Sequence, residues 1–93
     1  MREKLTEKIL TVQARKRGGI ALKFTSPGMD GMPDRLVLMP GGRMAFVEVK
    51  APGRKPRPLQ ESRHSMLRRL GFRVYVLDSR EQIGGILDEI QSS

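Results

Sequence analysis

The sequence predicts an α/β domain in which a mixed β-sheet is flanked by helices, with the elements in the order α-β-β-β-α-β-α. Three observations support this fold class. Apolar residues recur at helical spacing in three segments, short apolar runs lie between turns rich in glycine and proline, and a helix connects the last two runs. A strand, a helix and a strand in this order form a right-handed parallel unit in nearly all proteins. Because 93 residues bury one thin core only, we expect a single domain over 1–93.

The first segment is predicted to be an amphipathic helix over 2–17. Leu5, Ile9 and Val12 follow the i, i+4 and i+7 spacing of one helical face. A pair of glycines comes directly after this segment and supplies a C-terminal stop. Glu7 lies nearly opposite the apolar stripe, so it points away from the core if the stripe is the core face.

Three strands are predicted next. The segment 20–25 is short, leans apolar and is bounded by glycine and proline. A loop at 26–33 is dense in turn formers and leads into two apolar runs, 35–39 and 44–49. The residues between these runs, Pro-Gly-Gly-Arg at 40–43, are typical of a hairpin turn. Both alternating sets of side chains in the two runs are largely apolar, so we expect this part of the sheet to be covered on both faces.

The second half contains a loop, a helix, a strand and a last helix. The loop at 51–58 holds three prolines, and Pro58 suits the first turn of the helix that follows. An apolar strand at 72–77 comes next, and Ser79 with Gln82 three residues later is a candidate capping box for the last helix. Apolar residues at helical spacing mark these two helices: Leu59, Met66, Leu67 and Leu70 in one, and Ile83, Ile86, Leu87 and Ile90 in the other.

Composition limits the function classes. The chain has 18 Lys and Arg against 10 Asp and Glu, a net charge of +8, and the basic excess lies in 1–23 and 50–73. A charge of this size points to a polyanionic partner such as nucleic acid. The absence of cysteine excludes disulfides, zinc–thiolate sites and iron–sulfur clusters and fits a reducing, cytoplasmic setting. The chain starts without a signal-peptide pattern and has no apolar run near about 20 residues, so we expect a soluble protein with no membrane partner.

Three residues at the ends of the predicted hairpin could form a metal site. Asp34 stands just before its first strand, and Glu48 and Lys50 close its second strand. If paired residues have numbers that sum to about 82, the two carboxylates face each other with the lysine on the same face, whereas a slip of one residue would separate them. Paired carboxylates are natural ligands for Mg²⁺ or Mn²⁺ on a phosphate substrate. The alternatives are a turn or cap role for Asp34 and a solvated ion pair between Glu48 and Lys50.

Three motifs together resemble a known superfamily. They are Gly-Met-Pro-Asp-Arg at 31–35, Phe-Val-Glu-Val-Lys at 46–50, and Leu59 with Gln60 opening a helix. In this order they resemble the PD-(D/E)XK nucleases, and more narrowly the virus-type replication and repair nuclease (VRR-NUC) branch, which is found stand-alone in phages. The resemblance extends from about residue 7 to residue 77. It implies a restriction-endonuclease-like core and a Mg²⁺- or Mn²⁺-dependent endodeoxyribonuclease. Met32 departs mildly from the pattern, where a smaller apolar residue is expected.

The resemblance also implies roles for individual residues. Asp34 and Glu48 would bind the metal through their carboxylates, with the main-chain carbonyl of Val49 as a further ligand. Lys50 would position the attacking water. Gln60 would be the helix glutamine that assists the site or contacts the substrate backbone.

Other residues receive less direct roles. Glu7 matches the first-helix glutamate that supports the metal site, and Glu3 competes for that role. His64, the only histidine, sits in the middle of a helix and is expected at the surface or near DNA. The candidate phosphate contacts are basic residues near the site: Arg35, Arg54, Lys55 and Arg57.

These features favour a metal-dependent, structure-selective DNA endonuclease encoded by a phage or a bacterium. We expect it to act on branched DNA, as Holliday-junction resolvases do, and to do so as a homodimer that needs no organic cofactor. Two alternatives stay open. One is a non-catalytic basic module that binds nucleic acid, and the other is a nuclease that acts on RNA or on flap or other branched DNA.

Overall fold

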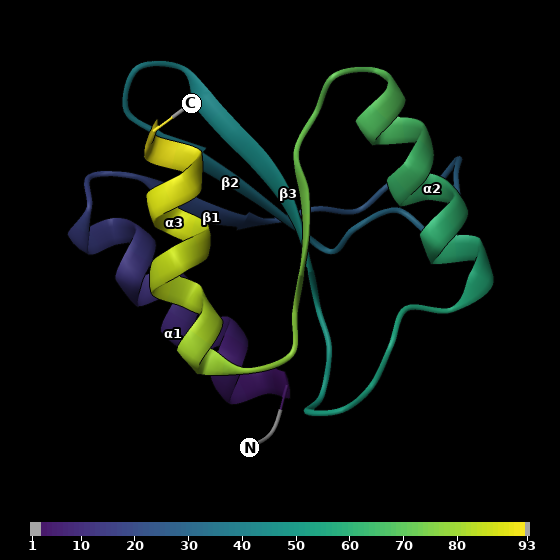
Figure 1. Ribbon diagram of the computed structural model, residues 1–93, viewed down its shortest axis with the longest axis horizontal. Coiled ribbons are helices and arrows are strands. Elements are labelled where there is room, and N and C mark those ends of the chain that lie inside the picture. Colours follow the sequence, from purple (N-terminus) through teal and green to yellow (C-terminus); the bar gives the residue numbers. More distant parts are fainter. Residues whose placement is uncertain (1–2, 93) are drawn as a thin grey trace.

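A four-stranded sheet forms the middle of the molecule, with helices on both of its faces (Figure 1). The computed structural model describes residues 3–92. Its elements are, in chain order, α1 (Glu3–Lys16), β1 (Ile20–Lys23), β2 (Arg35–Met39), β3 (Arg43–Val49), α2 (Pro58–Arg69), β4 (Val74–Leu77), the 3₁₀ turn η1 (Arg80–Gln82) and α3 (Ile83–Ser92). The predicted order α-β-β-β-α-β-α is therefore confirmed. Arg2, which the sequence placed in the first helix, lies outside the described residues.

The sheet is mixed, as predicted. β2 pairs antiparallel with both β1 and β3, and β3 pairs in parallel with β4 across the α2 crossover. In the hairpin, Arg35 pairs with Val47 and Met39 pairs with Arg43, which is the register that the metal-site hypothesis requires. The turn between them holds Gly41 at φ +85° and Gly42 at φ +76°, a conformation that glycine adopts without steric cost.

One face of the sheet carries the main apolar core. α1 and α3 pack against each other and against this face. The core consists of side chains from both helices and from all four strands: Leu10, Ala14, Ala21, Val37, Met39, Ala45, Val47, Val49, Leu77, Ile83, Ile86, Leu87 and Ile90. This cluster accounts for most of the buried apolar side chains in the described chain.

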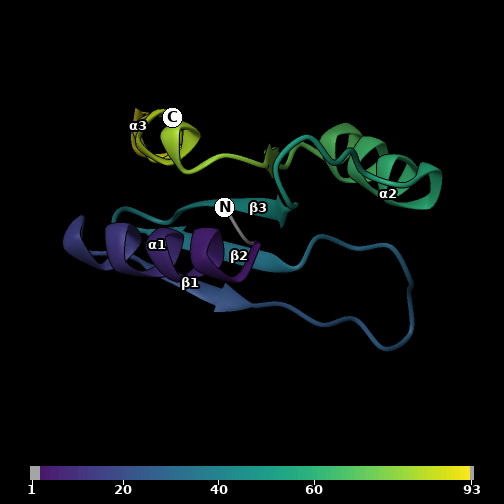
Figure 2. The same ribbon diagram turned by 90° about the horizontal axis from the view of Figure 1, so that it is seen from below.

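The opposite face of the sheet is covered only in part. α2 lies apart from α1 and α3 in both views (Figures 1 and 2) and packs through Leu67 against Phe46 and Val74. On the same face but beyond α2, Ile20 and Leu22 of β1 keep exposed fractions of 37% and 40%. The expectation of a hairpin covered on both faces is thus only partly met, because one helix cannot span four strands.

The first helix buries a different face from the one predicted. Thr6, Leu10 and Ala14 point into the core, whereas Leu5 and Val12 are 47% and 43% exposed. Only Ile9 of the Leu5, Ile9 and Val12 stripe packs against the core, so this stripe is not the core face. Small side chains at Thr6 and Ala14 let the helix backbone approach the sheet closely, and apolar spacing alone does not reveal this preference.

Strand and helix ends differ slightly from the predicted ones. β1 ends at Lys23 and β4 begins at Val74, so both are shorter than the apolar runs at 20–25 and 72–77. The Gln82 side chain accepts a hydrogen bond from the backbone N–H of Ser79, as the predicted capping box requires, but the turn that it starts is 3₁₀ before α3 begins. Among residues 3–92, no helix combines the length and apolarity required to cross a membrane.

Candidate active site

Asp34 is held against the end of β3. It stands directly before β2, and its Oδ1 accepts a hydrogen bond of 3.1 Å from the backbone N–H of Val49. The hairpin register continues outward from the Arg35–Val47 pair, which brings Asp34 opposite Glu48. The structure therefore brings the two carboxylates together at the end of the sheet, as the sequence predicts.

Glu48 is surrounded by polar groups although only 3% of the residue is exposed. Its Oε2 accepts a hydrogen bond of 3.3 Å from Gln60 Nε2 and lies 3.9 Å from Lys50 Nζ. Its Oε1 lies 3.6 Å from His64 Nε2. A buried charged group needs such partners, because an unpaired carboxylate in an apolar environment is strongly destabilising.

Burial makes both carboxyl groups reluctant to ionise. Burial and, to a smaller extent, the neighbouring charge of Asp34 raise the pKa of Glu48 to about 7, although Lys50 opposes this rise. Burial also raises the pKa of Asp34 to about 6, against the hydrogen bond from Val49, which favours the ionised form. Two acids that repel each other in this way are typical of a site where a divalent cation supplies the missing positive charge.

Gln60 is oriented by the start of α2. Pro58 occupies the first turn, and the backbone N–H of Arg57 donates a hydrogen bond of 2.9 Å to Gln60 Oε1. Because the amide oxygen is used in this bond, the amide nitrogen is the atom that faces Glu48. The helix start thus presents a fixed donor to the site, as expected for the helix glutamine.

Both acids of the first helix lie close enough to affect the site. Glu7 and Glu3 each raise the pKa of Asp34, and Glu3 also raises that of Glu48. Glu7 Oε2 forms an ion pair with Arg35 at 3.6 Å. The structure therefore places Glu7 next to the metal-site candidates and does not remove Glu3 as its competitor.

The predicted phosphate contacts fall into two groups. Arg54, Lys55 and Arg57 are exposed and line a hollow of about 330 Å³ that also includes Lys50 and Glu3. Arg35 differs, because its side chain is only 15% exposed and faces Glu7. The hollow beside Lys50 is therefore the more accessible surface for a polyanion.

His64 is not on the surface, which corrects the prediction from its mid-helix position. It is 2% exposed and lies one helical turn after Gln60, so both side chains point from α2 toward Glu48. Burial and the nearby Arg68 lower the pKa of the imidazole, which favours its neutral form. The i, i+4 spacing between Gln60 and His64 was the signal in the sequence that could have found it.

The oxygen atoms at this site suit Mg²⁺ or Mn²⁺. Two carboxylates and the backbone carbonyl of Val49 are hard oxygen donors, and Mg²⁺ commonly binds through one or two carboxylates while it keeps several waters. Glu48 Oε1 is buried and receives no hydrogen bond from the described residues, so an acceptor is left for a cation or a donor. No cluster of three or more His, Cys, Asp or Glu side chains suited to a metal occurs among residues 3–92.

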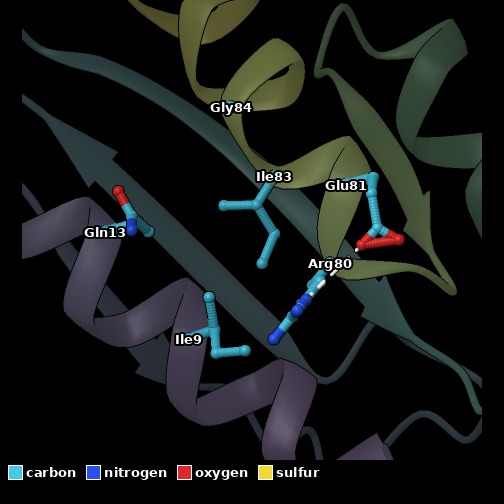
Figure 3. A pocket seen from close by; sticks show the side chains of 6 residues that line it. All are labelled: Ile9, Gln13, Arg80, Glu81, Ile83 and Gly84. Carbon is cyan, nitrogen blue, oxygen red and sulfur yellow. Dashed lines mark ion pairs between the residues drawn. The ribbon is translucent and has the colours of Figure 1, made fainter. Parts of the chain in front are cut away.

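A larger hollow lies elsewhere and lacks this chemistry. It measures about 680 Å³ and lies between α1 and the start of α3, with Ile9, Gln13 and Ile83 on its walls (Figure 3). Its two charged side chains, Arg80 and Glu81, form an ion pair with each other at 3.5 Å. The pair of carboxyl groups at the end of β3, Asp34 and Glu48, is thus the stronger candidate for an active site.

Comparisons with known proteins show the family to which this chain belongs. The family model of the VRR-NUC domain matches residues 4–81. A protein named "Putative nuclease p44", from Acyrthosiphon pisum secondary endosymbiont phage 1, is 54% identical over 81 residues, which are 87% of this chain and 87% of the relative. A solved structure described as a VRR_NUC domain has a TM-score of 0.86 at 33% sequence identity and covers 92% of this chain and 94% of its own. The fold class and the resemblance are confirmed, and the chain belongs to the VRR-NUC family of virus-type replication and repair nucleases.

Proposed function

We propose that the chain is a Mg²⁺- or Mn²⁺-dependent endonuclease that hydrolyses phosphodiester bonds in branched DNA. The observation that carries this proposal is the pairing of half-buried Asp34 with buried Glu48, beside Lys50, which lines a basic hollow. Acidic oxygens hold a cation there, and basic side chains beside it attract the phosphate backbone.

Each residue of the site has a part in the proposed reaction. Asp34, Glu48 and the carbonyl of Val49 hold the ion, which when bound polarises the phosphoryl group and lowers the pKa of a coordinated water. Lys50 Nζ, at 3.9 Å from Glu48, is free to donate to the attacking water or to the phosphoryl oxygen that gains charge. Gln60 keeps the Glu48 carboxylate in place. The bond that breaks is the one from phosphorus to the 3′ oxygen, which leaves a 5′-phosphate and a 3′-hydroxyl.

Glu7 supports the site from α1. Its ion pair with Arg35 fixes both side chains at the strand that follows Asp34, and its negative charge adds to the field that attracts a cation. We assign Glu7 rather than Glu3 this role because Glu7 has a defined partner on the sheet. Arg35 is then a phosphate contact only when it leaves this ion pair.

DNA is bound mainly through its backbone. Arg54, Lys55 and Arg57 extend from the loop that leads from Lys50 to α2, so their charges lie directly next to the reacting phosphate. The chain has one Tyr, three Phe and no Trp, which leaves little for stacking on bases. Branched structure rather than base sequence is therefore the proposed basis of substrate choice, and such DNA would be met in the cytoplasm of an infected bacterium.

The proposed active form is a homodimer that sets two sites across a branch point. A domain of 93 residues offers little surface to a four-way junction. The part of the sheet face that α2 leaves open presents Ile20, Leu22 and Leu38, each more than a third exposed, and a second copy would cover them.

Substitutions in β1 test the proposed dimer directly. Light scattering at micromolar concentration should give twice the mass of one chain, and Leu22→Glu should reduce it to that of one chain. Lys23→Glu is the matched control, because residue 23 lies on the same strand but faces the other side of the sheet. A wild-type mass of one chain would refute the dimer and leave the active site untouched.

Cleavage itself is tested with a panel of labelled substrates. Four-way junction, flap, duplex and matched RNA are incubated with the wild-type chain and with Lys50→Ala, in Mg²⁺, Mn²⁺ or EDTA. We expect metal-dependent cleavage that is fastest on the junction and is lost in Lys50→Ala. Faster cleavage of RNA would reassign the substrate, and cleavage that survives in EDTA or in Lys50→Ala would overturn the site.

A further inference from the structure

The two oxygens of the Glu48 carboxylate lie in different surroundings. Oε2 accepts from Gln60 and faces Lys50, so one oxygen is already held by the start of α2. Oε1 faces His64, whose Nε2 lies 3.6 Å away. Gln60 and His64 are separated by one turn of α2 and thus approach the same carboxylate from one helix face.

The contact between Glu48 and His64 joins two atoms that otherwise have no partner. Glu48 Oε1 and His64 Nε2 are both buried, and neither makes a hydrogen bond to another described residue. A buried polar atom without a partner destabilises the folded chain. Closing the gap by about half an ångström would give a normal N–H···O hydrogen bond and satisfy both atoms at once.

The chemistry of the imidazole fits a donor role. An imidazole ring always carries at least one N–H, and its nitrogen that faces Glu48 is Nε2. When that hydrogen is on Nε2, the ring donates to an oxygen of the carboxylate. Each carboxylate oxygen has a second lone pair, so an oxygen held in this way still has a site for a cation.

Filling space does not explain why a histidine stands here. α2 is anchored on the sheet by the apolar contacts of Leu67 with Phe46 and Val74, and an apolar side chain at 64 would extend that cluster. Instead, a ring with a polar atom is 2% exposed and directed at a buried acid. A hydrogen bond from this polar atom to the Glu48 carboxylate would explain the arrangement.

We propose that His64 is a positioning residue for the metal site, which donates its Nε2–H to Glu48 Oε1 and with Gln60 locks the carboxylate in one orientation before a cation arrives. The inference rests on the proposed function, since it concerns the affinity of the same site for Mg²⁺ or Mn²⁺. Residues that orient metal ligands in this way commonly change metal affinity by about 10–100-fold.

The test measures Mn²⁺ binding by calorimetry, without DNA and with folding checked by circular dichroism. We expect His64→Leu to weaken Mn²⁺ about 10-fold or more, and His64→Gln, whose amide nitrogen reaches the place of Nε2, to stay within about three-fold of wild type. Leu67→Met is the matched control on α2, a change of similar volume that leaves Glu48 untouched and should not alter affinity. Equal affinity of His64→Leu and wild type, or equal losses in the Leu and Gln variants, would overturn the proposal.

A second measurement needs no variant. His64 is the only histidine, so its ring nitrogen signals in a ¹⁵N NMR spectrum are assigned at once. We expect a hydrogen on Nε2, and a ring whose only hydrogen is on Nδ1 would overturn the proposal even if His64→Leu fails to fold. Absence of Mn²⁺ binding by the wild-type chain would instead refute the proposed function, so the two failures are distinguishable.

Discussion

The two faces of the sheet differ in what they bury. Between the sheet and the α1–α3 pair lies a continuous apolar cluster. Under α2 the apolar cluster is small, and next to it a carboxylate, an amide and an imidazole are buried together at Glu48, Gln60 and His64. Because most of the buried apolar side chains lie on one face, that face can stabilise the fold while the other face keeps polar groups that burial disfavours.

The largest effect is expected from a change at the polar face that leaves the fold intact. Glu48→Gln should keep the hydrogen-bonding shape of the side chain but remove a charge that the cation requires. We expect cleavage to fall by about 10³-fold or more, equivalent to roughly 4 kcal/mol of transition-state stabilisation. The measurement is a single-turnover rate on junction DNA, with circular dichroism as the check on folding. A fall of less than about ten-fold would mean that Glu48 is not a ligand.

A change at the apolar face should lower stability rather than act on the site directly. Leu87, which is fully buried in α3, loses contacts with the main cluster when it is shortened. Leu87→Ala is expected to lower the free energy of unfolding by about 2–5 kcal/mol, measured by urea denaturation. Leu67→Ala in the smaller cluster under α2 should cost less, because that cluster includes half-exposed members. Equal or reversed losses would show that the two faces contribute alike.

The acids of the polar face should make stability depend on pH. Asp34 and Glu48 hold protons more tightly in the folded chain than in the unfolded chain, because their pKa values rise to about 6 and about 7. The metal-free chain should therefore lose stability as the pH rises from about 4 to about 7. Asp34→Asn should raise the free energy of unfolding by about 1 kcal/mol at pH 8, after allowance for solvent screening, and by about half as much at pH 5.

Urea denaturation in EDTA at the two pH values measures this effect. Because Asn Oδ1 can still accept from the Val49 N–H, the variant keeps the local hydrogen bond. Addition of Mg²⁺ should stabilise the wild-type chain at pH 8 more than Asp34→Asn. A variant that is less stable than wild type at pH 8 would argue that Asp34 is a structural residue.

The smallest effect is expected at the basic hollow. Arg54→Ala should weaken junction binding a few-fold and reduce the slope of log affinity against log salt by about one, as expected for the loss of one phosphate contact. Fluorescence anisotropy between about 50 and 200 mM salt measures both quantities. Arg80→Ala is the control. It also removes one positive charge, but Arg80 belongs to η1 and lines the other, larger hollow, away from the site. Equal slopes in the two variants would mean that the charge acts only through the overall field.

The fold was predictable from the sequence because each element has a local signal. Gly41 and Gly42 mark the turn between the two runs. The register that brings Asp34 to Glu48 did not follow from the sequence, because both alternating sets of side chains in the runs are apolar and a slip of one residue would bury a similar surface. The buried face of α1 was not predictable from apolar spacing. Two of its buried residues, Thr6 and Ala14, have small side chains that allow close packing but add little to a hydrophobic pattern.

The site was predictable only in part, for a similar reason. Asp34, Glu48 and Lys50 follow from the hairpin, whereas the burial of His64 depends on how α2 packs across the sheet. Mid-helix position says nothing about that packing. The ion pair between Glu7 and Arg35 likewise joins two elements whose approach only the folded chain defines.

The central claim is that Asp34 and Glu48 form the metal site of a nuclease, and the most direct test measures binding and cleavage on the same samples of Asp34→Asn. With labelled junction DNA and Mg²⁺, we expect Asp34→Asn to lose cleavage while DNA binding is kept or becomes tighter, since a negative charge near the phosphates has been removed. Cleavage at the wild-type rate by Asp34→Asn would contradict it.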